Sequence, residues 1–216
     1  MKNLDKKSIA IFGGTGFFGK SLLIYFIKNK IKINKVVIVS RMPHKVKKII
    51  ENYDLPFKID YFRQDITKSI KYDQHVDYII HAAAESGTSL SKDNPLQMNN
   101  VIVEGTKNIL EYACQYKIKR ILYISSGAVY GKQPKDINKL PENFHGSPDS
   151  LNPLNAYGCA KKQAENLCAI YYHHFGLDYV IARCFAFVGP YLPLDSHFAI
   201  GNFIRDKLNN NPITIN

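Results

Sequence analysis

Tyr157 and Lys161 stand four residues apart in the stretch LNAYGCAKKQAENL. On a helix this spacing places the two side chains on one face, one turn apart. A phenol with a pKa of about 10 is a poor base near neutrality, and a neighbouring ammonium group stabilises the phenolate and lowers that pKa. The pair could therefore exchange a proton with a substrate oxygen, although the same spacing also occurs on any polar helix surface.

A second candidate site is the glycine-rich stretch AIFGGTGFFGKSLL near the N-terminus. Two registers fit it: Gly14-x-Gly16-x-x-Gly19 and Gly13-x-x-Gly16-x-x-Gly19. Because the stretch lies between a predicted strand and a predicted helix, its glycines allow a tight turn and close backbone approach to a pyrophosphate. The N-terminus of the helix would then bind the phosphates of a dinucleotide. The alternative is a glycine-rich turn without a ligand.

The end of the second predicted strand, VVIVSRMPHK, bears on which dinucleotide would bind. An acidic residue is expected there for NAD, to hold a ribose hydroxyl. Ser40 and Arg41 occupy this region instead. Since an arginine can pair with a 2′-phosphate in bidentate fashion, the sequence predicts NADP with Arg41 as the phosphate partner, and NAD as the alternative. An arginine simply solvated at a strand end is the other interpretation.

The scaffold behind these residues follows from alternating apolar and amphipathic segments. Strands are expected at 8–12, 35–40, 57–65, 76–84, 120–126 and 177–185, and helices at 18–30, 44–53, 95–116, around Tyr157 and at 203–211. This alternation predicts β-α-β units and an α/β fold with a parallel sheet covered on both faces. The proline-punctuated segment 131–153 is predicted to be a long loop, of the kind that often carries function.

Composition narrows the class of protein. The chain has 216 residues, 45% hydrophobic and 22% charged, which fits a globular protein of one large domain or a domain and a half. Its apolar runs, such as 22–27, are too short to cross a bilayer, and we recognise no secretory signal, so a cytoplasmic protein without a membrane partner is expected. The net charge of +11 comes from scattered lysines without an arginine-rich arm, so nucleic acid is not an expected partner.

No metal site is expected. The four cysteines show no zinc-like spacing and are interpreted as packing residues: Cys114, Cys159, Cys168 and Cys184. His173 and His174 are adjacent, and neighbouring residues point about 100° apart on a helix. They are therefore interpreted as surface or packing residues.

Four motifs together resemble a known family. GGTGFFG, ISSGAVYG, AYGCAK and ARCFAFVGP occur in the order and at the spacing of extended short-chain dehydrogenase/reductases, in the NAD-dependent epimerase/dehydratase group that acts on nucleotide sugars. The resemblance runs from Ser8 to the last residues. It implies a Rossmann-like doubly wound parallel sheet, with a dinucleotide-binding domain and catalytic triad in residues 1–190. Residues 191–216 would begin a substrate-binding part that is largely missing.

The resemblance also implies roles for individual residues. Tyr157 and Lys161 match the family's Y-x-x-x-K pair, and Ser126 matches its catalytic Ser/Thr. Tyr157 would exchange a proton with the oxygen at the carbon that exchanges hydride, Ser126 would hydrogen-bond that oxygen, and Lys161 would hold the nicotinamide ribose. The expected cofactor-binding residues are Gly13, Gly16, Phe17, Phe18, Gly19, Arg41, Asp65, Ile66, Ala82, Ala83, Tyr157 and Lys161.

Departures from the family pattern narrow the reaction. Dehydratases of the family carry Asp-Glu directly after the catalytic Thr, because eliminating water needs both a base and an acid. Gly127 and Ala128 stand here and can be neither, so a 4,6-dehydratase is not expected. Ala186 and Ile102 stand where many members have asparagine, and the asparagine at the first position usually contacts the nucleotide sugar, so the resemblance does not fix the substrate.

Three functions fit these observations. The first is an NAD(P)-dependent oxidoreductase that reduces a 4-keto-6-deoxyhexose nucleotide. The second is an epimerase, which oxidises and re-reduces one carbon while keeping NAD bound. The third is an inactive dinucleotide-binding fragment, since the sequence ends at NNNPITIN, where the family continues. A homodimer is expected only by analogy.

Overall fold

A computed structural model of the chain describes residues 4–84, 94–195 and 199–213. It contains a six-stranded sheet in which every pair of neighbouring strands is parallel. The strands are β1 (Ser8–Phe12), β2 (Lys35–Ser40), β3 (Lys58–Arg63), β4 (Tyr78–His81), β5 (Arg120–Ser126) and β6 (Tyr179–Cys184). Their order, β3-β2-β1-β4-β5-β6, is that of the doubly wound dinucleotide-binding sheet, so the predicted fold class is confirmed.

The central strands are buried on both faces, as their continuous apolar runs predict. All residues of β1 are buried, and Val36–Val39 of β2 are 0% exposed. Successive side chains alternate between two apolar clusters: Ala10 and Phe12 belong to one, and Ile9 and Ile11 to the other. The alternation follows from the two-residue period of a strand.

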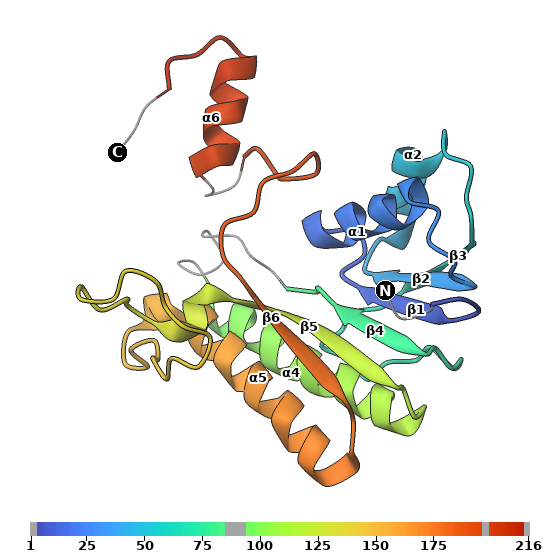
Figure 1. Ribbon diagram of the computed structural model, residues 1–216, viewed down its shortest axis with the longest axis horizontal. Helices are drawn as coiled ribbons and strands as arrows, with labels where there is room; N and C mark the ends of the chain where they lie inside the picture. Colours follow the sequence, from blue (N-terminus) through green and yellow to red (C-terminus); the bar gives the residue numbers. More distant parts are fainter. Residues whose placement is uncertain (1–3, 85–93, 196–198, 214–216) are drawn as a thin grey trace.

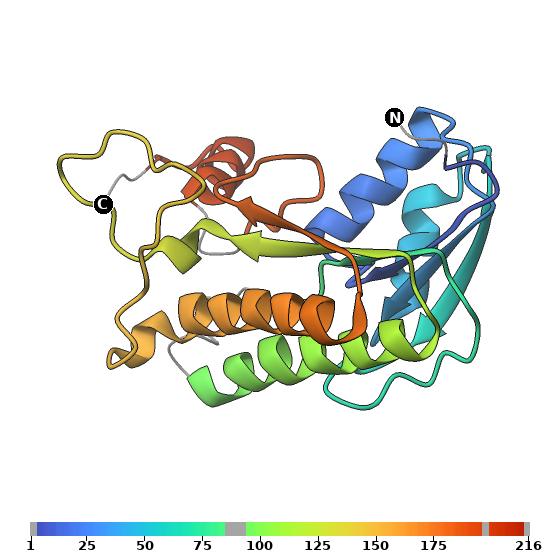
Figure 2. The same cartoon turned by 60° about the horizontal axis from the view of Figure 1, so that its bottom comes forward.

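Helices cover the two faces of the sheet. α1 (Phe17–Lys28) and α2 (Lys47–Ile50) lie on one face, whereas α4 (Pro95–Gln115) and α5 (Ala156–Phe175) run side by side over the other (Figure 1 and Figure 2). After β6 the chain leads away from both faces to α6 (Ala199–Leu208) (Figure 1). Within the described ranges, no helix combines the length and the apolar character needed to cross a membrane.

One predicted helix is shorter than expected. In place of a helix over 44–53, the chain forms a 3₁₀ turn at Pro43–Val46 and then the single turn of α2. Val46 and Ile50 are buried four residues apart, and after them only Tyr53, which is half-buried, continues the stripe before Pro56. So short a stripe does not support a longer helix.

The ends of the strands define the edge at which ligands would bind. Because all strands are parallel, their carboxyl ends meet at one edge, with Phe12 paired to His81 and Ser126 to Cys184. Residues that directly follow these strands share the edge: Gly13, Arg41, Ala82, Gly127 and Phe185. In open parallel sheets ligands bind outside this edge, where the strand order reverses, which is here between β1 and β4.

Candidate active site

The glycine loop closes tightly against the end of β4. Gly13 has φ +82°, and a Cβ there would lie 2.6 Å from the Ala83 nitrogen. At Gly19, in the first turn of α1, a Cβ would lie 2.5 Å from the Gly13 carbonyl oxygen. The Gly16 N–H donates to that same oxygen at 2.9 Å. The turn therefore requires glycine at positions 13 and 19.

The N-terminus of α1 fits the pyrophosphate of a dinucleotide. Its N-cap is Gly16, no side chain caps it, and its first turn contains no acidic residue. The unsatisfied N–H groups and the partial positive charge of the helix end are thus directed at the carboxyl edge. Such a donor set binds phosphate. The rings of Phe17 and Phe18 pack on each other with centroids 5.3 Å apart, and Phe18 also packs on Phe187, with centroids 5.2 Å apart.

The backbone of Ala82 and Ala83 forms the facing wall of this loop. The Ala82 N–H donates to the Phe12 carbonyl at 2.9 Å, and a Cβ on Gly13 would strike both alanines. Ile66, in contrast, turns its side chain into the core, where its Cδ1 lies 2.5 Å from the position of a Cβ on Gly105. Among the expected cofactor-binding residues, Ala82 and Ala83 thus lie at the glycine loop, whereas the side chain of Ile66 packs in the core.

Arg41 follows β2 and lies near Asp65, which follows β3. Asp65 Oδ1 accepts hydrogen bonds from the backbone N–H and the hydroxyl of Thr67, each at 2.9 Å. These bonds and the positive charges of Arg41 and Lys68 lower the pKa of the Asp65 carboxyl. Both Arg41 and Asp65 are exposed. A phosphate at Arg41 would therefore sit close to an ionised carboxylate.

Ser126, Tyr157 and Lys161 meet between the end of β5 and the first turns of α5. The Tyr157 hydroxyl lies near enough to Ser126 for that side chain to act on its pKa. Lys161 is 3% exposed, donates through Nζ to the Ile124 carbonyl at 2.7 Å, and lies 5.9 Å from the centroid of the Tyr157 ring. The structure thus brings together the three side chains that the sequence singled out for catalysis.

Burial dominates the electrostatics of this cluster. Desolvation raises the pKa of Tyr157, and the hydrogen bond with Ser126 opposes the rise. Desolvation lowers the pKa of Lys161 to about 8, and Cys184 and Glu165 oppose the fall. The lowered tyrosine pKa was expected from Lys161 together with an oxidised nicotinamide, and it stays a prediction for the cofactor-bound enzyme. In the free chain the Lys161 ammonium donates to the Ile124 carbonyl, and burial sets the direction of the Tyr157 shift.

A partly buried ion pair, Glu165–Arg183, lies behind these residues and was not predicted from the sequence. Glu165 is 7% exposed and accepts hydrogen bonds from Ser125 Oγ at 2.5 Å and Arg183 Nη2 at 2.8 Å. The guanidinium of Arg183 lies 4.7 Å from the centroid of the Tyr130 ring and donates to the Glu142 carbonyl at 3.1 Å. A signal was present: Arg183 interrupts an apolar strand, and charged residues are rarely buried unless they are paired.

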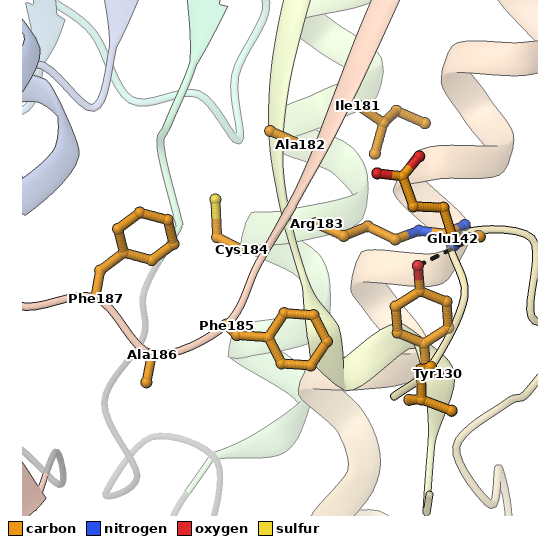
Figure 3. Close-up of a pocket in the computed structure, with 10 residues that line it drawn as sticks. Tyr130, Glu142, Ile181, Ala182, Arg183, Cys184, Phe185, Ala186 and Phe187 are labelled. Atoms are coloured by element: carbon orange, nitrogen blue, oxygen red, sulfur yellow. Dashed lines mark hydrogen bonds between the residues drawn. The ribbon is translucent and has the colours of Figure 1, made fainter. Parts of the chain in front are cut away.

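A cavity of about 740 Å³ opens along β6 beside this pair. In Figure 3, Arg183 and Cys184 project to opposite sides of the strand, and the Tyr130 hydroxyl points at the Glu142 carbonyl. Residues of the connection between β5 and α5, of β6 and of the segment after β6 line it: Tyr130, Leu140, Glu142, Ile181, Ala182, Arg183, Cys184, Phe185, Ala186 and Phe187. Leu140 and Glu142 belong to the predicted loop 131–153, so this loop forms one wall of the cavity.

An aromatic ring covers the position directly after Ser126. Phe185 stacks on Tyr130, with centroids 6.2 Å apart and planes at 19°. The same ring lies over Gly127, where a Cβ would be 2.5 Å from Phe185 Cε1. The space beside Ser126 is therefore apolar, and neither Gly127 nor Ala128 supplies an acid or a base.

No metal centre is evident in the described part of the chain. No three His, Cys, Asp or Glu side chains there are grouped so that they could hold an ion. His173 and His174 are exposed on α5, and all four cysteines are free. Burial raises the pKa of the Cys168 thiol to about 12.

Comparisons with known proteins all point to one family of enzymes. The sequence model of the "NAD dependent epimerase/dehydratase family" matches residues 9–216. The dTDP-D-glucose 4,6-dehydratase of Dictyostelium discoideum is 29% identical over 100% of this chain and 52% of its own length. UDP-glucuronic acid decarboxylase 3 of Arabidopsis thaliana is 29% identical over 96% of this chain and 58% of its own.

Solved structures agree. A UDP-N-acetylglucosamine 4-epimerase from Methanobrevibacter ruminantium M1, in complex with UDP-N-acetylmuramic acid, superposes with a TM-score of 0.79 at 26% identity, over 96% of this chain and 64% of that one. A UDP-glucuronic acid 4-epimerase from Bacillus cereus, in complex with UDP-glucuronic acid and NAD, gives 0.77 at 27% identity, over 96% and 65%. The chain thus spans from about half to just under two thirds of the length of these relatives.

Proposed function

This chain belongs to the NAD dependent epimerase/dehydratase family, and from that premise we propose that it is the cofactor-binding and catalytic part of a nucleotide-sugar oxidoreductase. Residues 1–190 would bind the dinucleotide and carry the triad, and residues 191–216 would begin the substrate-binding part. One observation carries the proposal: Lys161 is fixed by the Ile124 carbonyl, 5.9 Å from the centroid of the Tyr157 ring and beside Ser126, at the same edge of the sheet as the uncapped glycine loop.

Each residue has a definite task in this proposal. A bound nicotinamide supplies or accepts the hydride. The backbone of Gly13, Gly16 and Gly19, with the start of α1, holds the pyrophosphate. The Tyr157 hydroxyl exchanges a proton with the sugar oxygen, and Ser126 Oγ hydrogen-bonds that oxygen. Lys161, fixed by the Ile124 carbonyl, holds the nicotinamide ribose and favours the phenolate when Tyr157 loses its proton.

The first candidate reaction is reduction of a keto group on a nucleotide-linked 4-keto-6-deoxyhexose. The raised pKa of Tyr157 supports it, because a phenol that stays protonated near neutrality can donate to the oxygen formed when the keto carbon is reduced. The apolar surroundings of Gly127 argue against water elimination, since no side chain there can protonate a leaving hydroxyl.

The second candidate is epimerisation. It is favoured by the two solved relatives described above, which are both epimerases and one of which holds NAD. An epimerase returns the hydride to the carbon from which it came, so the cofactor shows no net change. An inactive dinucleotide-binding fragment remains the third candidate.

The choice of cofactor turns on Arg41. Its guanidinium could pair with the 2′-phosphate of NADP, and we take NADP as the preferred cofactor, with NAD second. Asp65 acts in the opposite direction, because its carboxylate lies close enough to Arg41 for the two charges to interact. A guanidinium shared with a carboxylate binds a phosphate less strongly than one that is not shared.

The test is a fluorescence titration of the 216-residue chain with NADPH and with NADH. The chain contains no tryptophan, so the signal of the reduced nicotinamide has little background. Incubation with sugar nucleotides follows: stoichiometric loss of NADPH with a keto-sugar nucleotide identifies a reductase, and interconversion of two hydroxyl epimers of a sugar nucleotide without net cofactor change identifies an epimerase. Tyr157→Phe should bind the cofactor and lose turnover. If the folded chain binds neither NADPH nor NADH, the proposal is wrong.

A further inference from the structure

Glu165 joins three structural elements behind the catalytic residues. It lies on α5, and its carboxylate is bonded to Ser125 of β5 and to Arg183 of β6. Ser125 and Arg183 are themselves partners in the register of β5 and β6. Three groups therefore converge at one carboxylate that is nearly removed from solvent.

The position of this carboxylate relates directly to the triad. Glu165 follows Lys161 by four residues and Tyr157 by eight, so the three side chains lie along one side of α5. Ser125 is the residue before Ser126. The bond between Glu165 and Ser125 ties α5 to β5 one residue before Ser126, at the end of the strand that Tyr157 also faces.

We propose that Glu165 is a positioning residue: through Ser125 and Arg183 it holds α5 against the end of β5 and so places Tyr157 and Lys161 relative to Ser126. The inference rests on the proposed function of the triad and extends it to residues outside the motifs that identify the site. Glu165 does not itself touch the reacting atoms. It acts through the groups that it orients.

The charge of Glu165 supplies a second, measurable link to Lys161. The groups around the Lys161 ammonium come from each element packed against it: His81 of β4, Tyr123 of β5, Cys184 of β6, and Tyr157, Glu165 and Cys168 of α5. The pKa values of both tyrosines and both cysteines are raised, and burial lowers that of His81 to about 3. Glu165 is the carboxyl group in this described set, and its charge raises the pKa of Lys161 against the effect of burial.

A residue that only stabilises the fold and a residue that positions the triad differ in their effect on Lys161 and Tyr157, not in their effect on melting temperature. Replacing a buried ion pair can be neutral or even stabilising. Melting temperature alone thus cannot decide the question. The deciding readout is the titration of Lys161 itself, because that readout depends on where Glu165 places its charge and needs no turnover.

The experiment is a ¹³C NMR titration of the 216-residue chain with lysine labelled at Cε, in which the Lys161 signal is assigned by its loss in Lys161→Arg. In Glu165→Gln we expect the midpoint of Lys161 to fall by roughly one unit, and Glu165→Asp should recover part of the shift. Asp178→Asn is the matched control. It removes the Arg120–Asp178 pair (2.7 Å) at the opposite end of the same two strands and should leave Lys161 unchanged.

Ser125→Ala guards against misfolding, because it removes one hydroxyl and leaves the ion pair in place. We expect the ¹³Cζ signal of Tyr157 to shift in this variant, since α5 is no longer bonded to β5 at that point. If the Lys161 midpoint in folded Glu165→Gln and the Tyr157 signal in Ser125→Ala both match the wild type, the inference is overturned. A chain that binds no cofactor but shows both shifts would refute the proposed function and leave this inference intact.

Discussion

Lys161 of α5 reaches back to β5 and donates through Nζ to the Ile124 carbonyl, 2.7 Å away, in a site where it is 3% exposed. An ammonium group held in this way is desolvated, and its pKa falls to about 8. This contact therefore links the packing of α5 on β5 to the charge state of the site.

The stability of the fold should depend on the charge of Lys161. Its pKa in the folded chain lies below the ordinary value of 10.5, so between about pH 8 and 10.5 the unfolded chain binds more protons and stability rises with pH. Relative to Lys161→Met, which has no charge to bury, the wild type should gain about 3 kcal/mol across this window. Urea unfolding of both proteins at several pH values measures the difference. A gap that does not change with pH would contradict the lowered pKa.

Gly13→Ala should abolish dinucleotide binding. The substitution combines a positive φ with a Cβ placed 2.6 Å from the Ala83 nitrogen, so the loop must move away from β4. Gly176→Ala is the matched control, because Gly176 has φ +68° but nothing lies within 4 Å of its added Cβ. Both variants should lose stability, by roughly 1–3 kcal/mol. In NADPH titrations, only Gly13→Ala should lose affinity; equal losses in the two variants would contradict a role for the loop.

Arg41→Ala should separate the two cofactors. A charge-assisted hydrogen bond to phosphate contributes roughly 1.5–3 kcal/mol, which corresponds to a loss of about tenfold or more in NADPH affinity. NADH lacks the 2′-phosphate, so its affinity should stay within about twofold. Arg120→Ala, at the amino end of β5, is the control for the change in net charge. A parallel loss for NADPH and NADH would show that Arg41 does not read the 2′-phosphate.

Gly127 and Phe185 should be energetically coupled. A methyl group at position 127 would displace the Phe185 ring, which is 67% exposed and can swing away at modest cost. We expect Gly127→Ala to cost about 1 kcal/mol in the wild-type background and nothing in Phe185→Ala. Urea unfolding of the four proteins of this cycle measures the coupling. Equal costs in the two backgrounds would show that the ring does not rest on Gly127.

The sequence predicts the sheet well because the signals there are local. β1, β2 and β5 begin and end at the predicted residues, since each is a continuous apolar run between polar residues. The glycine loop and the Tyr157–Lys161 pair are likewise local patterns. Glu165, Ser125 and Arg183 are not: they come from three separate elements, and only the folded sheet shows that they meet. The burial that raises the pKa of Tyr157 in the free chain is also a result of packing, so no local pattern signals it.

β6 stands at one end of the sheet, and Val180 within it is 45% exposed, as is Phe187 beyond it at 47%. The outer side of an end strand offers its amide and carbonyl groups to any extended polypeptide that approaches. A further strand can therefore pair with β6 and widen the sheet, and an extended segment of any polypeptide can supply it. Because the cavity beside Arg183 is lined in part by β6 itself, a strand added there would lie next to the residues of that cavity.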